Sequence, residues 1–307
     1  MSLAVEVAVR AGFDRVSKIQ RRIASEYRLA TMIGRSPCTG HRHVLLIGNS
    51  LLYADIQFDR LRDAIGTECD VRRFVIEQTG YMDWYYGLRR LFHNGARPDV
   101  VVLVLTARQS IGSSIRGDYS AEYLIDKNDL PSAVRDLRLN PTEATDLLFA
   151  GVSKFWATRA EIRNFVLGHL MPDLGGLMQF SGAVNPTPLV DDEVEHIMYA
   201  RLARLKAISD AYGAKLVIVV PPIHEERDGA AGFLRAGSAA GVAMVRPVPS
   251  GSLPSRSFLP DRFHLSEIGA AEFTGRLIPL LREQLERRGV RRSPATTAAV
   301  QSSRASL

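Results

Sequence analysis

Residues 43–50 read His-Val-Leu-Leu-Ile-Gly-Asn-Ser, an apolar run that stops at a glycine and two polar residues. A short continuous apolar run is typical of a parallel strand that is buried on both faces. Apolar residues at helical spacing follow over 51–65. This stretch therefore predicts a strand, a turn and a helix, with the hydroxyl of Ser50 at the carboxyl edge of a sheet.

The same alternation of strand and helix continues along the chain. Further strands are expected at 71–76, 100–105, 215–220 and 242–245, and further helices at 81–93, 194–212, 229–237 and 266–288. Ser266 is placed to cap the last helix and Pro279 to bend it. Strands separated by helices pair in parallel through right-handed crossovers. The expected fold class is α/β, a three-layer α/β/α sandwich.

Four segments differ in character. Residues 1–40 indicate a basic helical lead-in, and 41–290 form the expected α/β domain. Within it, 107–191 is too long for one connection and indicates a helical insertion, interpreted as a cap over the carboxyl edge of the sheet. Residues 291–307 lack bulky side chains and periodicity, and predict a disordered tail.

Composition narrows the class of protein. The 307 residues are 46% hydrophobic and 23% charged, as in an ordinary soluble globular protein. The net charge of +6 lies in the ends: 1–40 and 282–307 carry +4 each, and the remainder carries −2. This pattern favours contact of the ends with anionic surfaces and argues against a nucleic-acid partner.

The amino-terminal region gives mixed signals about location. No run approaches the ~18 apolar residues that span a bilayer. Glu6 and Arg10 interrupt the first apolar stretch, so a signal peptide is not expected. Basic residues over 14–35 favour either a simple amphipathic lead-in helix or the juxtamembrane remainder of an anchor, and such a basic helix could contact a membrane surface. We expect a cytoplasmic protein as written, and an envelope or membrane-associated one if an anchor is missing.

A second motif, Asp261-Arg-Phe-His264, lies far along the chain from Ser50. An imidazole can take the proton of a serine hydroxyl, and a carboxylate can orient that imidazole. Ser50, His264 and Asp261 are therefore candidates for nucleophile, base and orienting acid. The simpler interpretations are a helix cap at Ser50 and a solvated loop at 261–264.

Two backbone N–H groups are candidate donors to a developing oxyanion. The N–H of Ser50 lies at the start of the predicted helix, and the N–H of Gly80 follows the second strand, with no side chain to obstruct it.

These residues resemble the SGNH or GDSL family of serine hydrolases and acyltransferases. Gly48-Asn-Ser-Leu51 looks like the nucleophile block, with Asn49 where Asp is usual, and Gly80 looks like the glycine of the second block. Residues 261–269, Asp-Arg-Phe-His-Leu-Ser-Glu-Ile-Gly, look like the final block. The resemblance covers roughly 43–106 and 215–288. It implies a flavodoxin-like sheet, an acyl-serine intermediate, and neither a metal nor another cofactor.

The third block departs from the family's pattern. Its usual Gly-x-Asn-Asp is replaced by Thr106-Ala-Arg-Gln109, so the Asn that donates to the oxyanion is missing. Gln109 could supply an amide in its place, and Arg108 could bind substrate. Trp84 could line a sugar-binding wall or pack in the core.

Two functions follow. The first is hydrolysis or transfer of a small acyl group, with acetyl as the first candidate, on a carbohydrate or similar ester, in line with relatives that modify envelope polysaccharides. The second is a catalytically inactive carbohydrate-binding or scaffold protein that kept the fold; the missing Asn favours it.

Overall fold

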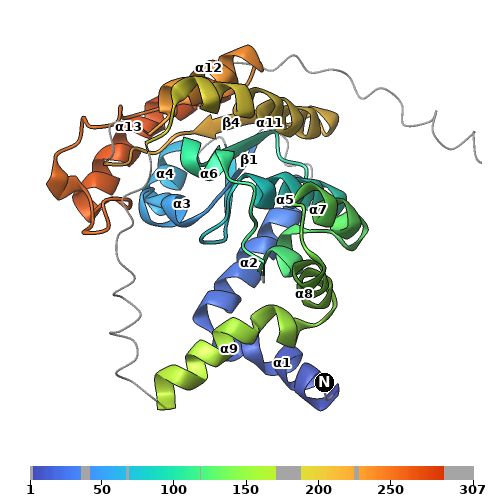
Figure 1. The fold of residues 1–307 in the computed structure, drawn as a ribbon. Helices are drawn as coiled ribbons and strands as arrows, with labels where there is room; N and C mark the ends of the chain where they lie inside the picture. Colours follow the sequence, from blue (N-terminus) through green and yellow to red (C-terminus); the bar gives the residue numbers. More distant parts are fainter. Residues whose placement is uncertain are drawn as a thin grey trace, which may run out of the picture.

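A five-stranded parallel sheet forms the centre of the molecule (Figure 1). The computed structural model describes residues 3–35, 42–66, 69–117, 119–170, 188–224 and 228–286. The strands are β1 (Arg42–Gly48), β2 (Cys69–Val75), β3 (Val100–Val104), β4 (Lys215–Val219) and β5 (Ala243–Val245), in the order β2-β1-β3-β4-β5. This is the flavodoxin-like order, so the predicted fold class is confirmed.

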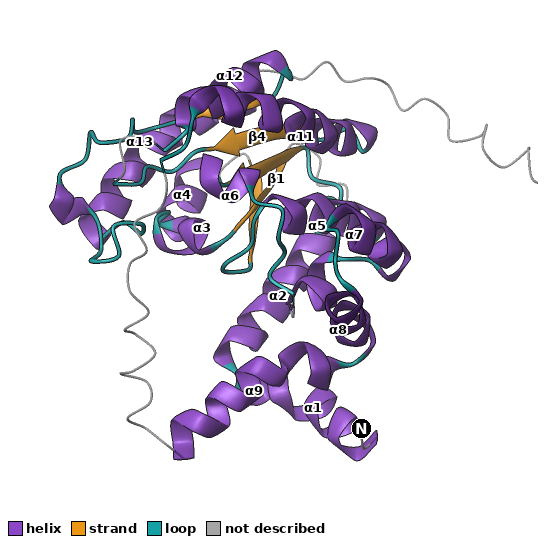
Figure 2. Ribbon diagram, viewed as in Figure 1, coloured by secondary structure: helices purple, strands orange, loops and turns teal. Residues whose placement is uncertain are grey.

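Helices cover both faces of the sheet (Figure 2). One face carries α2 (Lys18–Met32), α5 (Tyr81–His93), α11 (Asp191–Ala211) and α12 (Ala230–Ala239), and the other carries α4 (Phe58–Ile65) and α13 (Glu267–Glu286). Alternate strand residues serve the two layers: Leu45 and Ile47 pack on the first face, Val44 and Leu46 on the second. This double burial explains why the strands are almost continuously apolar.

The register brings three strand ends level with one another. Gly48 at the end of β1 pairs with Val75 of β2 and with Val104 of β3. The loops that leave these three strands therefore start side by side at the carboxyl edge, where ligands bind in open parallel sheets. The sheet thus gathers residues 49–50, 76–80 and 105–109 at one place.

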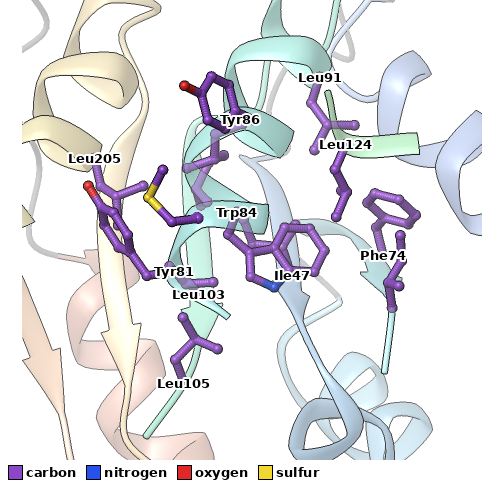
Figure 3. Close-up of a cluster of buried hydrophobic side chains, with 14 of the residues drawn as sticks. Ile47, Phe74, Tyr81, Trp84, Tyr86, Leu91, Leu103, Leu105, Leu124 and Leu205 are labelled. Carbon is purple, nitrogen blue, oxygen red and sulfur yellow. The ribbon is translucent and has the colours of Figure 1, made fainter. Parts of the chain in front are cut away.

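Trp84 belongs to the core. It is fully buried, packs edge-on against Phe74 with ring centroids 5.6 Å apart, and donates its indole N–H to Thr79 Oγ1 at 3.0 Å. Figure 3 shows it among Ile47, Phe74 and Leu103. Of the two interpretations of Trp84, packing in the core is therefore right and the substrate-binding wall is wrong, because the indole packs against Phe74 and is closed off from solvent.

Helix α2 is part of the sandwich. Its Ile23 is fully buried in the core, and its Glu26 accepts the backbone N–H of Val75 and the guanidinium of Arg73, both at 2.9 Å. These contacts cover the end of the edge strand β2, whose outer N–H groups would otherwise face open solvent. The predicted lead-in, 1–40, thus contains a helix that packs against the sheet.

The insertion extends beside the sheet. It contains α6 (Ala107–Ile111), a π-helical turn (Ser120–Leu124), a 3₁₀ turn (Lys127–Asp129), α7 (Leu130–Asp136), α8 (Pro141–Val152) and α9 (Lys154–Leu170). With α1 (Leu3–Val16), α8 and α9 project away from the sheet (Figure 1). Glu161 accepts hydrogen bonds from Ser17, Gln20 and Tyr119 in this projection. Within the described residues, α9 thus packs against α1 and α2 instead of covering the carboxyl edge, whereas residues 171–187 of the expected cap lie outside the described residues.

Two further comparisons with the sequence concern the chain ends. None of the helices within the described residues meets the combined length and hydropathy that a bilayer crossing requires. The predicted disordered tail, 291–307, lies outside the described residues.

The last helix begins where the sequence predicts. Ser266 precedes α13, and its Oγ accepts the N–H of Gly269 at 3.3 Å. A Cβ at Gly269 would lie 2.1 Å from the carbonyl oxygen of Ser257. The glycine therefore permits the start of α13 to touch the loop that precedes it.

We expect Gly269→Ala to lower the free energy of unfolding by about 1–3 kcal/mol, because the added methyl group forces this backbone contact apart. Urea denaturation would measure the change. Gly12→Ala is the matched control: Gly12 also lies in a helix, but a Cβ there meets nothing within 4 Å. Equal stability of Gly269→Ala and the wild type would contradict the close approach.

Candidate active site

Ser50 is held at the carboxyl end of β1. It opens the short helix α3 (Ser50–Ala54), and the buried Asn49 is the helix N-cap. Asn49 accepts the N–H of Leu51 at 3.1 Å and donates its amide to the carbonyl of Thr79 at 2.9 Å. The residue before the serine therefore caps the helix and also ties the loop before Gly80 to the same place.

His264 lies in a tight loop before α13. An antiparallel bridge joins Phe258 to Leu265, and the N–H of Leu259 donates to the carbonyl of His264 at 2.8 Å. Within the loop, Asp261 accepts the N–H groups of Phe263 and His264 at 2.9 and 3.0 Å. These bonds fix the backbone that carries the imidazole.

The structure brings the three candidate side chains into one hydrogen-bonded row. His264 Nε2 lies 2.9 Å from Ser50 Oγ, and His264 Nδ1 lies 2.7 Å from Asp261 Oδ2. A carboxylate can only accept, so the ring proton sits on Nδ1, and Nε2 is left to accept the serine hydroxyl. This is the geometry of a nucleophile, a base and an orienting acid, although the catalytic roles themselves stay a prediction.

Asp261 is ionised at neutral pH. Desolvation pushes the pKa of Asp261 up, but hydrogen bonds from the His264 ring and from the N–H groups of His264 and Phe263 outweigh it and lower that pKa. The side chain of Asp261 is 48% exposed and that of His264 is 24% exposed, so the row lies open to solvent. Solvent can therefore reach the row.

Gly80 lies beside the third loop of this edge. A Cβ at Gly80 would stand 2.9 Å from the carbonyl oxygen of Gln109. The Gly80 N–H, however, donates to Asp83 Oδ2 at 2.8 Å. This differs from the prediction that Gly80 is an oxyanion donor, because the carboxylate of Asp83 already accepts that hydrogen.

Gln109 is anchored by one end of its side-chain amide. Its Oε1 accepts the N–H of Thr106 at 3.1 Å and the hydroxyl of Thr106 at 3.2 Å, which caps α6. The backbone donor identifies this atom as the oxygen, so the amide nitrogen is the atom of this side chain that can donate to a further acceptor. Arg108 is half-buried in the same turn, and its predicted contact with substrate stays a prediction.

Asp83 joins the Gly80 loop to the insertion. Besides the Gly80 N–H, its carboxylate accepts the N–H of Arg116 at 3.1 Å and the hydroxyl of Ser120. Burial raises the pKa of Asp83 to about 6, although these three hydrogen bonds and the charge of Arg116 pull in the opposite direction.

Three polar residues of the site escaped the sequence interpretation as positioning groups: Asn49, Asp55 and Asp83. Asn49 drew notice only as a departure from the family's pattern. Asp83 stands three residues after Gly80, a spacing that is typical of a helix capping box and could have revealed it. Nothing around Asp55 in the sequence indicates its burial.

Comparison with known proteins gives similarity of fold only. No family model matches the chain, and no curated protein does. A carbohydrate esterase family 3 structure from Talaromyces cellulolyticus aligns over 81% of this chain and 100% of its own, with 10% identity and a TM-score of 0.43. An alpha/beta hydrolase from the metagenome of Lake Arreo, Spain, aligns over 78% and 94%, with 12% identity and a TM-score of 0.41. An acetylxylan esterase from Geobacillus stearothermophilus aligns over 78% and 93%, with 12% identity and a TM-score of 0.38.

Protonation of Asp83 should make stability depend on pH. Because folding raises its pKa from 3.8 to about 6, the folded protein binds this proton more tightly than the unfolded chain does. The resulting stability is fully present below pH 3.8 and is lost as the pH rises through about 6. We expect the free energy of unfolding of the wild type, relative to Asp83→Asn, to fall by about 2 kcal/mol between pH 4 and pH 7.

Urea denaturation of both proteins across this range would measure the difference. Asp83→Asn is the control for the wild type, because its side chain at residue 83 cannot titrate. Parallel stability curves would show that Asp83 does not titrate there.

Proposed function

We propose that the protein is a serine esterase or O-acyltransferase that works through an acyl-serine intermediate. One observation carries the proposal: the hydrogen-bonded row of Ser50, His264 and Asp261 at the carboxyl edge of the sheet. A helix cap at residue 50 and a solvated loop at 261–264 would each be satisfied without this contact across 214 positions of sequence.

The first half of the reaction forms the acyl-enzyme. Ser50 Oγ attacks the carbonyl carbon of the ester, and its proton passes to His264 Nε2. The tetrahedral intermediate then breaks its bond to the alcohol oxygen, which leaves with the proton from Nε2. Asp261 keeps the ring in the required tautomer and stabilises the imidazolium between the two transfers.

The second half releases the acyl group. Water or the hydroxyl of an acceptor sugar gives its proton to His264 Nε2 and attacks the acyl carbon, and the bond to Ser50 Oγ then breaks as Oγ takes the proton back. Water yields a carboxylic acid and a sugar hydroxyl yields a new ester. These steps involve only side chains and substrate, and we propose no metal or other cofactor.

Two donors suit the oxyanion. The N–H of Ser50 lies at the start of α3, before the first intrahelical hydrogen bond, so no carbonyl of that helix accepts it. The Gln109 amide nitrogen is the second, because its oxygen is held by Thr106. The N–H of Gly80 would join them only if Asp83 released it.

The proposed substrate is a small acyl ester, with acetyl groups of a carbohydrate first among candidates. This part rests on the resemblance of the motifs and on the open position of the row. Contact of the basic amino-terminal helices with a membrane surface remains a further proposal.

A catalytically inactive carbohydrate-binding or scaffold protein is the second candidate. The engagement of the Gly80 N–H by Asp83 favours it, since a site with one donor fewer stabilises the oxyanion less. This candidate predicts that Ser50→Ala binds carbohydrate as the wild type does, and that aryl acetates are cleaved no faster than in buffer.

Acetyl release and acetyl transfer, assayed on aryl acetates and a panel of acetylated sugars, would test the enzyme proposal. We expect Ser50→Ala and His264→Ala to lower kcat by about 10⁴ or more, and Asp261→Asn by about 10³–10⁴. Asp63→Ala, an exposed carboxylate on α4, is the control and should match the wild type. Full activity in Ser50→Ala would remove the nucleophile.

Gln109 allows its donor role to be separated from its cap. Gln109→Glu keeps an oxygen for the Thr106 N–H but loses the amide hydrogens, whereas Gln109→Ala loses both. We expect both variants to lower kcat by about 10²-fold or more with KM little changed. Only Gln109→Ala should also lose stability, by about 1 kcal/mol. Wild-type kcat in Gln109→Glu would exclude Gln109 from the oxyanion site.

A further inference from the structure

Asp55 is a buried carboxyl group that the proposed reaction does not use. It is fully buried and follows α3 as its C-terminal cap, five positions after Ser50. Its Oδ1 accepts the N–H of Leu265 at 2.9 Å, a contact between residues 210 positions apart. Its Oδ2 is buried and finds no hydrogen-bond partner among the described residues.

This contact joins the two halves of the hydrogen-bonded row. The N–H of Asp55 donates to the carbonyl of Leu51 at 2.9 Å, and Leu51 is fully buried, so Asp55 is held against the short helix α3. The same helix therefore begins with Ser50 and ends at a carboxyl group that holds the residue after His264. Ser50 and His264, which are remote in sequence, are thus both connected to α3.

We propose that Asp55 is a positioning residue: its side chain anchors Leu265 and so keeps the imidazole of His264 within hydrogen-bond distance of Ser50. The proposal rests on the proposed function of those two residues. Leaving the Leu265 N–H without a partner in this buried place would also be unfavourable, which gives the contact its persistence.

The surroundings favour the neutral acid. Burial raises the pKa of Asp55 well above its ordinary value, and the negative charge of Asp261 raises it further, although the Leu265 N–H lowers it. Two carboxylates close together resist ionising at once, and Asp261 is the ionised one. A neutral acid accepts the Leu265 N–H through its carbonyl oxygen. The amide oxygen of an Asn side chain can accept the same hydrogen bond.

Other contacts hold the same region of the fold. The N–H of Gln57 donates to Thr274 Oγ1 at 2.9 Å, and Arg60 donates to the carbonyl of Ala271 at 2.9 Å. The junction between α3 and α4 is therefore attached to α13 independently of Asp55. We expect Asp55 variants to fold, so that effects on the reaction can be measured.

Kinetics on an aryl acetate would test the proposal. We expect Asp55→Ala to lower kcat about 10- to 100-fold with KM within about 2-fold, because His264 drifts from Ser50 while substrate contacts persist. Asp55→Asn should retain kcat within about 3-fold of the wild type, and Asp63→Ala serves as the exposed control. Wild-type kcat in Asp55→Ala would overturn the proposal, as would a loss in Asp55→Asn equal to that in Asp55→Ala.

Amide hydrogen exchange supplies a readout that does not require activity. The N–H of Leu265 should exchange at least about 10-fold faster in Asp55→Ala than in the wild type, and it should stay protected in Asp55→Asn. If the wild type cleaves no ester, the proposed function fails, and this measurement still decides whether Asp55 holds the loop. Unchanged protection in Asp55→Ala would overturn the positioning role.

Discussion

The proposed chemistry of the site depends on the hydrogen bond between Ser50 Oγ and His264 Nε2. It joins residues 214 positions apart, so no local preference of the chain can produce it. The sheet positions Ser50, because the register of Gly48 with Val75 and Val104 fixes where the chain leaves β1. The turn from Phe258 to Leu265 positions His264.

Buried polar side chains connect these regions. Asn49 ties the serine turn to the loop before Gly80, Asp83 ties that loop to the insertion, and Asp55 ties α3 to the histidine loop. A buried polar group that loses its partner costs about 1–3 kcal/mol, so each of these contacts resists opening. The site is held by polar contacts at the edge of a core that is itself almost wholly apolar.

The sequence predicts the strands well, because burial on both faces leaves a continuous apolar signature; helix α5 was also predicted with the bounds observed, Tyr81–His93. The region 51–65 was expected as one helix but is two, α3 and α4, because Asp55 ends the first at a contact with Leu265. Tertiary contacts of this kind carry no periodic signal.

The candidate site divides in the same way. Ser50, Asp261 and His264 could be proposed from residue type and flanking pattern, and the structure brings them together. For Trp84 the sequence leaves both a sugar-binding wall and core packing open, and it does not predict that Asp83 accepts the Gly80 N–H, because both outcomes depend on tertiary contacts. Residue type shows which chemistry a side chain could perform, and tertiary packing determines whether the side chain is available for it.

Labelling with a fluorophosphonate tests the central claim most directly, because the probe reacts with a serine whose hydroxyl is activated by a neighbouring base. The account predicts that folded protein gains one phosphonyl group, that peptide mapping places it on Ser50, and that His264→Ala and Ser50→Ala both abolish it. An unlabelled wild type, or a label on another residue that persists in Ser50→Ala, would contradict the account.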